Sequence, residues 1–585
     1  MLEAAAAPLT VDPLEADARR RRPHALLPLL LWLVAGALML TGLGGRPVQR
    51  TQEARVLEVA RQMLGKPLDR WMVPRVNDRL RLRKPPLAYW AAAGAYTVAG
   101  GVSEAAGRVP TVLASWLTLA GVYVAGAWLF NRRAGLLAAA ALLSSYLFFW
   151  HARLAETDPW AMLFVTFGTL AFWKAVAPET FAGGMHAGAR RQATWFHAGA
   201  ACVALAFLSK FGPAVFLILF LVLLAAVRRR PGAVWTFVRC GAILTAVVPP
   251  LLWLGYASRH ADLRQIGEEF SNNWHGEGHD APFFAYFYML PVAAVPWTGV
   301  MVVAVVEAAR RWRRDVRLQG LLVWAGSMLL PLFVTGNKQP HYLMTVMPCL
   351  MVLVGWAIDE TIRLRDPGRS TDKAGDPPGD PVADPIVEPT ADSPGDLAFA
   401  GLLARVFWIS VAACGVAALA APVAARNLRG TSRPADFLVG TGIALAMGAV
   451  AWAGRRRGIG AATGTFAAAW AVALTVTSAW WWPTVEPNDP RAVAAEIRRV
   501  AGDGPYCSYP KVVYLPLCFA LRAEVPAAAD AKELRELVEA DPRLRVIARR
   551  RARAQKEPPG PDFKLELEVR NDDNVYELYR YAPPR

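Results

Sequence analysis

Apolar runs long enough to cross a lipid bilayer recur along most of this 585-residue chain, and they limit its fold more than any other feature. A helix needs about 20 apolar residues to span the hydrocarbon core, and about thirteen runs meet that length. Their centres lie near residues 34, 119, 142, 168, 203, 220, 246, 294, 327, 351, 411, 445 and 470. The sequence therefore predicts a polytopic α-helical membrane protein with about thirteen transmembrane helices.

Basic clusters in the loops predict how these helices are oriented, because cytoplasmic loops carry an excess of Lys and Arg. With the cluster at 19–22 inside and thirteen crossings, the later basic clusters also fall inside. A short apolar run at 87–101 follows two prolines, and counting it as a crossing would send those clusters outside. We therefore expect an interfacial or re-entrant helix there and an exoplasmic C-terminus. The net charge of +17 then reflects topology and anionic lipid, with no nucleic acid as partner.

The N-terminal part divides into a tail and a membrane module. Residues 1–24 are expected to be a cytoplasmic tail, and residues 25–364 form the main transmembrane module. Within this module, residues 46–108 form a long basic exoplasmic loop, in which "QEARVLEVARQML" has the apolar stripe of an interfacial amphipathic helix.

The C-terminal part contains two segments that are not predicted to span the membrane. Residues 365–398 are rich in Pro, Gly and Asp, which is typical of a disordered cytoplasmic linker. After further transmembrane helices at 399–482, residues 483–585 alternate helical and strand-like patterns, which predicts a small exoplasmic α/β domain. Cys507 and Cys518 share this domain, and a disulfide between them stays open because spacing does not establish geometry.

Charged and polar side chains from distant segments fall on the exoplasmic side of this topology. Each also fits an ordinary role, such as a solvated helix face, snorkelling towards lipid phosphates, helix N-capping or the aromatic belt of a membrane protein. Their convergence on one face suggests a site for a substrate that is part lipid and part water-soluble. The candidates are Glu53, Arg55, Lys84, Asp158, Lys210, His279, Lys338, His341 and Tyr342.

The order of motifs along the chain adds a resemblance to a known family. The motifs are "QEARVLEVARQMLGKPLDRWMVPRVNDRLRLRKPPLAYW", "SEAAGRVPTVLASW", "ARLAETDPWAMLF", "FLSKFGP", "HDAPFFAYFYMLPVAAVPW" and "NKQPHYLMTVMP". Together they resemble the polyprenyl-phosphate-dependent glycosyltransferases of the GT-C fold. The nearest branch is that of the lipid A aminoarabinose transferases and protein O-mannosyltransferases, and the resemblance covers about residues 25–365.

This resemblance implies a pair of catalytic carboxylates drawn from the first two exoplasmic loops. Asp158 matches the acid of the second loop. The first loop of the family usually carries an Asp-Glu dipeptide, where this chain has Gln52–Glu53. A Gln side chain is neutral and cannot act as a general base, so we expect Glu53 to be the base, with Asp158 as its partner or substitute.

The resemblance also implies a set of polar side chains that bind the phosphate of the lipid carrier. Cations in a partly dry site stabilise the negative charge that develops on a departing phosphate. The matching positions are Arg55, Lys84, Lys210, Lys338 and Tyr342.

The resemblance assigns no cofactor. Some relatives are expected to hold a metal through an acidic residue just before the matching Lys, but that position is Arg83 here. His279 matches the family's loop histidine, so a divalent metal at that residue stays open. Gln52 and His341 remain further site candidates.

On this resemblance we expect an inverting glycosyltransferase, a hexosyl- or pentosyltransferase of the inner or plasma membrane. It would move a sugar from a polyprenyl-phosphate carrier to a lipid or protein acceptor, at a site that faces the periplasm or the exterior. Two alternatives stay open: a transporter or flippase for polyprenyl-linked sugars, and a catalytically degenerate relative that only binds lipid. Few charges fall in the middle of the predicted spans, which favours an enzyme working at one membrane face.

Overall fold

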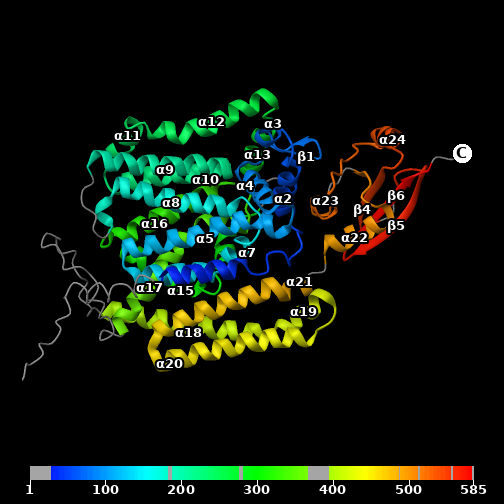
Figure 1. Cartoon of the computed structure of the whole chain (residues 1–585). Coiled ribbons are helices and arrows are strands. Elements are labelled where there is room, and N and C mark those ends of the chain that lie inside the picture. The colour runs from blue at the N-terminus through cyan, green and yellow to red at the C-terminus, as the bar shows by residue number, and fades with distance from the viewer. Residues whose placement is uncertain are drawn as a thin grey trace, which may run out of the picture.

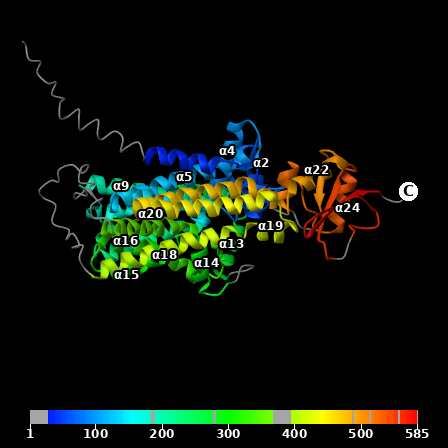
Figure 2. The ribbon, with the colours of Figure 1, turned by 90° about the horizontal axis from the view of Figure 1, so that it is seen from below.

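Long helices that run roughly parallel to one another form the body of the molecule, and a smaller unit with a β-sheet lies beyond one end (Figure 1). The view from below shows the same division (Figure 2). The computed structural model describes residues 28–181, 188–275, 281–365, 394–485, 488–510, 514–554 and 558–582. The predicted N-terminal tail and most of the predicted linker lie outside these residues.

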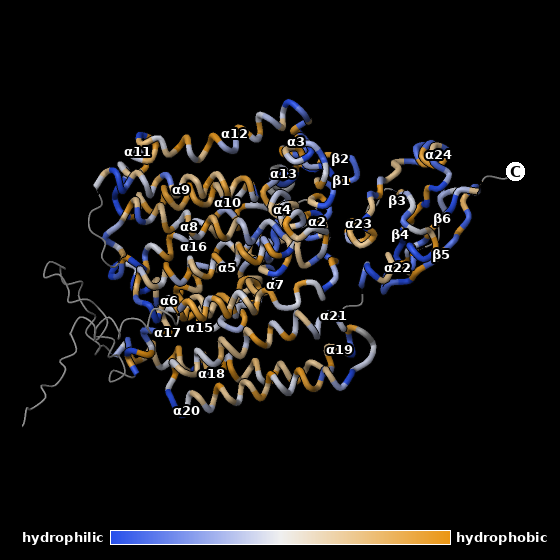
Figure 3. Tube along the Cα trace, viewed as in Figure 1, coloured by the Kyte–Doolittle hydropathy of each residue, from blue (hydrophilic) through white to orange (hydrophobic). Residues whose placement is uncertain are grey.

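Most helices of the body are apolar along their length, with hydrophilic residues gathered near their ends (Figure 3). The helices of the body are Pro28–Leu40, α5 (Glu104–Leu129), α6 (Arg132–Leu143), α7 (Tyr146–His151), α8 (Asp158–Val176), α9 (Ala189–Ser209), α10 (Phe211–Val227), α11 (Gly232–Arg239), α12 (Ala242–His260), α14 (Ala285–Ala293), α15 (Thr298–Arg310), α16 (Val316–Val334), α17 (Met347–Arg365), α18 (Pro394–Ala418), α19 (Ala421–Arg429), α20 (Pro434–Val476) and α21 (Trp482–Val485).

Six helices of the described residues are long and apolar enough to cross a membrane, by length and composition. They become seven if α14 and α15, which are bent by 117° relative to each other, form one broken span. The chain is therefore an integral membrane protein. Twelve of the thirteen predicted span centres lie inside a described helix, and the centre at 294 falls at the bend between α14 and α15. The helix α18 begins at Pro394, so residues 394–398 are helical rather than part of a disordered linker.

The helix α20 reverses direction at Gly458, which has φ 84° and ψ 177°. Only glycine adopts such a backbone conformation without strain. The indole N–H of Trp481 donates to Asp436 at 2.9 Å, although 45 residues separate them. A straight helix of that length would hold these residues about 65 Å apart, so the two arms of α20 lie against each other. This hairpin accounts for the two predicted spans centred at 445 and 470.

The loop that follows the first helix folds into short elements at the sheet-bearing end of the body (Figure 1). They are α2 (Thr51–Met63), α3 (Leu68–Met72), β1 (Arg75–Val76), β2 (Arg79–Leu80) and α4 (Leu87–Ala99). At 13 residues α4 is too short to cross a membrane. The apolar stripe of α2 is buried in one cluster with α4 and with Phe519 of the C-terminal unit, so it packs on protein rather than on lipid.

The C-terminal unit contains a four-stranded sheet in the order β3-β4-β6-β5. The strands β3 and β4 are parallel, and the other two pairs are antiparallel. Cys507 and Cys518 are buried free thiols, so no disulfide joins them. The elements are α22 (Pro490–Ala501), β3 (Tyr506–Ser508), α23 (Leu515–Leu521), α24 (Ala531–Ala540), β4 (Arg545–Arg551), β5 (Phe563–Asn571) and β6 (Asn574–Tyr581).

Close packing of α17 on α6 depends on Gly355. A Cβ atom at this residue would lie 2.5 Å from the carbonyl oxygen of Ala134 and 2.6 Å from the amide nitrogen of Ala138, and neither backbone atom can move alone.

We expect Gly355→Ala to destabilise the full chain by about 1–3 kcal/mol. Gly326→Ala is the matched control, because nothing lies within 4 Å of its Cβ position and Ala favours a helix. Thermal unfolding in detergent measures both; equal melting temperatures would contradict this packing.

Candidate functional site

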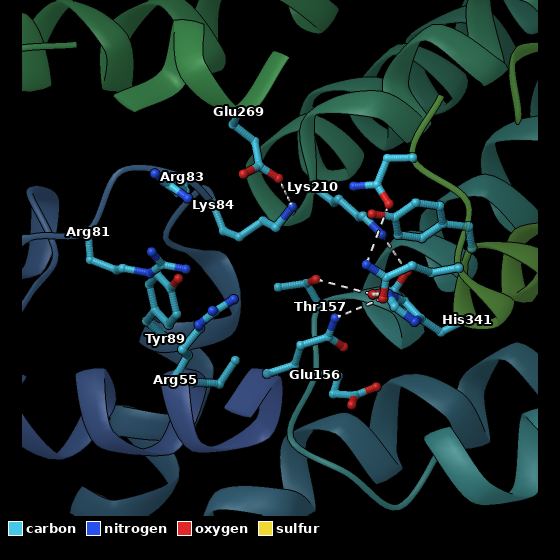
Figure 4. Close-up of a pocket in the computed structure, with 16 residues that line it drawn as sticks. Arg55, Arg81, Arg83, Lys84, Tyr89, Glu156, Thr157, Lys210, Glu269 and His341 are labelled. Atoms are coloured by element: carbon cyan, nitrogen blue, oxygen red, sulfur yellow. Dashed lines mark hydrogen bonds and ion pairs between the residues drawn. The ribbon is translucent and has the colours of Figure 1, made fainter. Parts of the chain in front are cut away.

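A cavity of about 220 Å³, drawn close up in Figure 4, opens beside α2, at the end of the body next to the C-terminal unit (Figure 1). Its lining comes from segments as far apart as α2 and the 3-10 helix η2 (Pro340–Thr345). Five cations and three carboxylates line it, a formal excess of two positive charges. They are Arg55, Arg81, Arg83, Lys84, Lys210, Glu156, Asp158 and Glu269.

An ion pair at the start of α8 forms one side of the cavity. Asp158 is the first residue of α8, and Pro159 follows it. The Oδ1 atom of this buried side chain accepts a hydrogen bond from the Lys210 ammonium at 2.6 Å. The ammonium also lies 4.0 Å from the centre of the Tyr342 ring. His341 Nε2 lies 4.0 Å from the other oxygen of Asp158. Burial lowers the pKa of His341 to about 3, so this imidazole is neutral at physiological pH.

Guanidinium and ammonium groups from the loop between α2 and α4 form the other side. Lys84 pairs with Glu269 of α13 (Arg264–His275), and Arg83 lies 3.5 Å from Glu268. Burial lowers the pKa of Lys84, although Glu269 opposes this shift. Burial also lowers the pKa of Arg55, and the nearby Arg81 guanidinium adds to the effect. Cations crowded in this way favour the binding of an anion, which would relieve their repulsion.

Glu53 lies behind the cavity wall rather than in its lining. Its side chain is 1% exposed, and both oxygens accept from Arg108 of α5, at 2.7 and 3.1 Å. One oxygen also accepts from the amide of Ala155 at 3.2 Å, three residues before Asp158. The two predicted acids therefore belong to one end of the molecule. The carboxylate that the sequence analysis expects to be the base is thus held in a buried ion pair with Arg108.

Lys338 is likewise turned away from the cavity. Its ammonium donates to backbone carbonyls at the C-terminal end of α16, including Phe333 at 3.2 Å and Thr335. Lys338 thus caps that helix end, where free carbonyls attract a cation. The expectation that it binds a phosphate has no support in this geometry. His279 lies outside the described residues.

Several residues of the cavity were not assigned a role from the sequence. Glu156 sits in the quoted motif "RLAETDPW", and Glu269 in "EEFSNNW", yet neither motif shows which of its acids meets the cavity. Arg108, which lies behind the cavity with Glu53 rather than in its lining, could have been found, because an arginine inside an otherwise apolar helix is a functional or structural signal. Gln52, by contrast, was a candidate from the sequence; it lines the cavity and donates to Gln339 at 3.3 Å. Across the described ranges, no three His, Cys, Asp or Glu side chains gather as metal ligands do.

Comparisons with known proteins agree with this architecture. The family described as dolichyl-phosphate-mannose-protein mannosyltransferase matches residues 83–253. The structure of ArnT from Cupriavidus metallidurans superposes with a TM-score of 0.69 over 95% of this chain and 98% of that protein, at 17% identity. A second structure of ArnT, bound to undecaprenyl phosphate, has the same TM-score over 94% of this chain and 97% of that protein, also at 17% identity.

The resemblance to the polyprenyl-phosphate-dependent glycosyltransferases of the GT-C fold is confirmed.

Curated proteins similar to this chain are undecaprenyl phosphate-alpha-4-amino-4-deoxy-L-arabinose arabinosyl transferases. That of Proteus mirabilis is 24% identical over 327 residues, which are 54% of this chain and 57% of that protein. That of Pseudomonas fluorescens is 27% identical over 364 residues, 59% of this chain and 61% of that protein. The chain thus spans about three fifths of the length of the curated relatives it matches.

The buried pair of Glu53 and Arg108 should be sensitive to the loss of either partner alone. In Arg108→Met the Glu53 carboxylate loses its counter-charge, which typically costs about 3–5 kcal/mol. The double variant Glu53→Met/Arg108→Met removes both charges and should recover much of that stability. Thermal unfolding of the purified chain measures the three proteins. A single variant as stable as the wild type would contradict this assignment.

Proposed function

We propose that this chain is an inverting glycosyltransferase that moves a sugar from a polyprenyl-phosphate carrier to a lipid or protein acceptor. The observation that carries the proposal is the cavity at one end of an apolar helical body, with its excess of partly buried cations. A lipid-linked phosphate can reach such a site from the membrane while its sugar meets water. The fold shared with ArnT and the names of the curated relatives support the same substrate class.

The cations of the cavity would bind the carrier phosphate. An anion that enters the cavity would lower the free-energy cost of burying the positive charges of Lys84 and Arg55. Lys210 is held in place by its hydrogen bond to Asp158. As the sugar leaves, charge builds up on the phosphate oxygens, and these fixed cations stabilise it. Tyr342 positions Lys210 through its ring. One-step displacement by an acceptor hydroxyl would invert the anomeric carbon.

The proposed topology places the cavity at the exoplasmic face. Arg133 and Arg311, from two basic clusters, both pair with acids near the C-terminal end of α17. The N-terminal end of α17 follows η2, which lines the cavity. Because basic clusters face the cytoplasm, the cavity and the C-terminal unit would face the periplasm or exterior. Thirteen crossings and the division into residues 25–364, 399–482 and 483–585 are part of this proposal.

A transfer assay tests the proposal directly. The full chain in lipid nanodiscs would receive undecaprenyl-phosphate-linked sugars with a radiolabel, 4-amino-4-deoxy-L-arabinose among them, and a total membrane extract as acceptor. We expect Lys84→Met and Asp158→Asn each to lower transfer by about 10²–10⁴-fold, because they remove phosphate stabilisation and release Lys210. Lys532→Met is a matched control, since that lysine side chain is 86% exposed on the C-terminal unit.

The outcomes separate the candidate functions. Transfer by the wild type and loss in both variants would support a glycosyltransferase. With the chain reconstituted into lipid vesicles instead of nanodiscs, movement of labelled donor across the bilayer without transfer would favour a transporter or flippase. Donor binding without transfer or transport would indicate a catalytically degenerate relative. Normal transfer in both variants would contradict the proposed site.

A further inference from the structure

Glu156 brings a buried carboxylate to the cavity in the loop between α7 and α8. Its side chain is 2% exposed. The Oε2 atom is paired with Nδ1 of His151 at 2.6 Å. The Oε1 atom is buried and accepts no hydrogen bond from any residue that the structure describes, although the Nε atom of Arg50 lies 3.2 Å away as an ion-pair partner. A carboxylate has about four acceptor sites, so beside the Arg50 guanidinium this oxygen at the cavity wall can still accept a hydrogen bond from a ligand.

The other acids of this region are already engaged. Both oxygens of Glu53 accept from Arg108 behind the wall. Asp158 holds Lys210 through one oxygen, and Thr157 donates to the other at 3.4 Å. Glu269 is paired with Lys84 on the opposite side of the cavity from Glu156 (Figure 4). Glu53 and Glu269 would have to give up a charged partner before they could act on a hydroxyl, and Asp158 is used to hold Lys210.

Arg50 ties Glu156 to Gln52. Its Nε lies 3.2 Å from Glu156 Oε1, and its Nη2 donates to the amide oxygen of Gln52 at 3.4 Å. One guanidinium, just before α2, therefore contacts both side chains. The guanidinium that contacts the neutral Gln52 side chain thus also contacts a carboxylate, which comes from a different segment of the chain.

We infer that Glu156 is the general base of the proposed transfer, with His151 and Arg50 as the residues that position it. The inference rests on the proposed function. Oε1 accepts the proton of the acceptor hydroxyl as the acceptor oxygen bonds to the anomeric carbon. The bond from that carbon to the phosphate oxygen breaks, and its electron pair stays on the phosphate among the cations. The proton later passes from Glu156 to water.

The protonation state of Glu156 suits this role. Burial alone would raise its pKa, but His151, Arg50 and His341 together lower it to about 2. The side chain is therefore ionised at physiological pH and accepts rather than donates a hydrogen bond. Such a carboxylate is a weak base in bulk water, so its contribution depends on a hydroxyl held within hydrogen-bond reach.

The test compares Glu156→Gln, Gln52→Glu and the double variant Glu156→Gln/Gln52→Glu in the transfer assay. We expect Glu156→Gln to lower transfer by about 10²–10⁴-fold, with undecaprenyl phosphate binding unchanged because the cations remain. In the double variant, the carboxylate moves to the other side chain on Arg50, and we expect at least a tenfold recovery over Glu156→Gln. A purely structural role for Glu156 would not be rescued in this way.

Azide provides a second readout, since this anion attacks the sugar without losing a proton. We expect Glu156→Gln to transfer sugar to azide at about the wild-type rate, while transfer to hydroxyl acceptors is lost. Equal loss with both acceptors, or hydroxyl transfer within threefold of the wild type, would overturn the inference.

If Glu156→Gln does not fold, the double variant decides: it should transfer, and an inactive folded double variant would also overturn the inference. An inactive wild type would instead refute the proposed function itself.

Discussion

The buried ion pair between Glu53 and Arg108 is the interaction on which the candidate site depends. It joins α2 to α5, and the same carboxylate accepts from the amide of Ala155, so three segments meet at one point. On the cavity side of this point, α2 presents Arg55, and the loop after α7 presents Glu156. A charge pair in an apolar interior is stable only when both partners stay in place. The ion pair therefore holds the segments that line the cavity in position, although neither of its members lines the cavity itself.

Electrostatics within the cavity follows from how its charges are paired. Asp158 and Glu269 each hold a lysine, whereas the guanidinium groups of Arg55 and Arg81 lie close to each other. Burial and mutual repulsion make these cations less stable without an anion. Phosphate binding and the stabilisation of a leaving phosphate thus have one physical origin, and the acids orient the cations around it.

The sequence predicted the helical body and the end at which polar residues converge, because apolar length and loop charge act over whole segments. It could not predict which side of a short helix faces the cavity. Glu53 and Arg55 are two residues apart on α2, yet one faces Arg108 and the other lines the site. Lys338 was chosen by motif and instead caps α16. Glu156 was missed because its neighbour Asp158 has the more familiar position before a helix. Such distinctions depend on tertiary packing.

The central claim is that cations from distant segments share one lipid-borne phosphate. The most direct measurement is a cryo-electron microscopy structure of the full chain in nanodiscs with undecaprenyl phosphate. The account predicts phosphate density in the cavity, with oxygens about 3 Å from Lys84 Nζ and from the Arg55 guanidinium. Density for the phosphate elsewhere on the protein, with an empty cavity at saturating lipid, would contradict it.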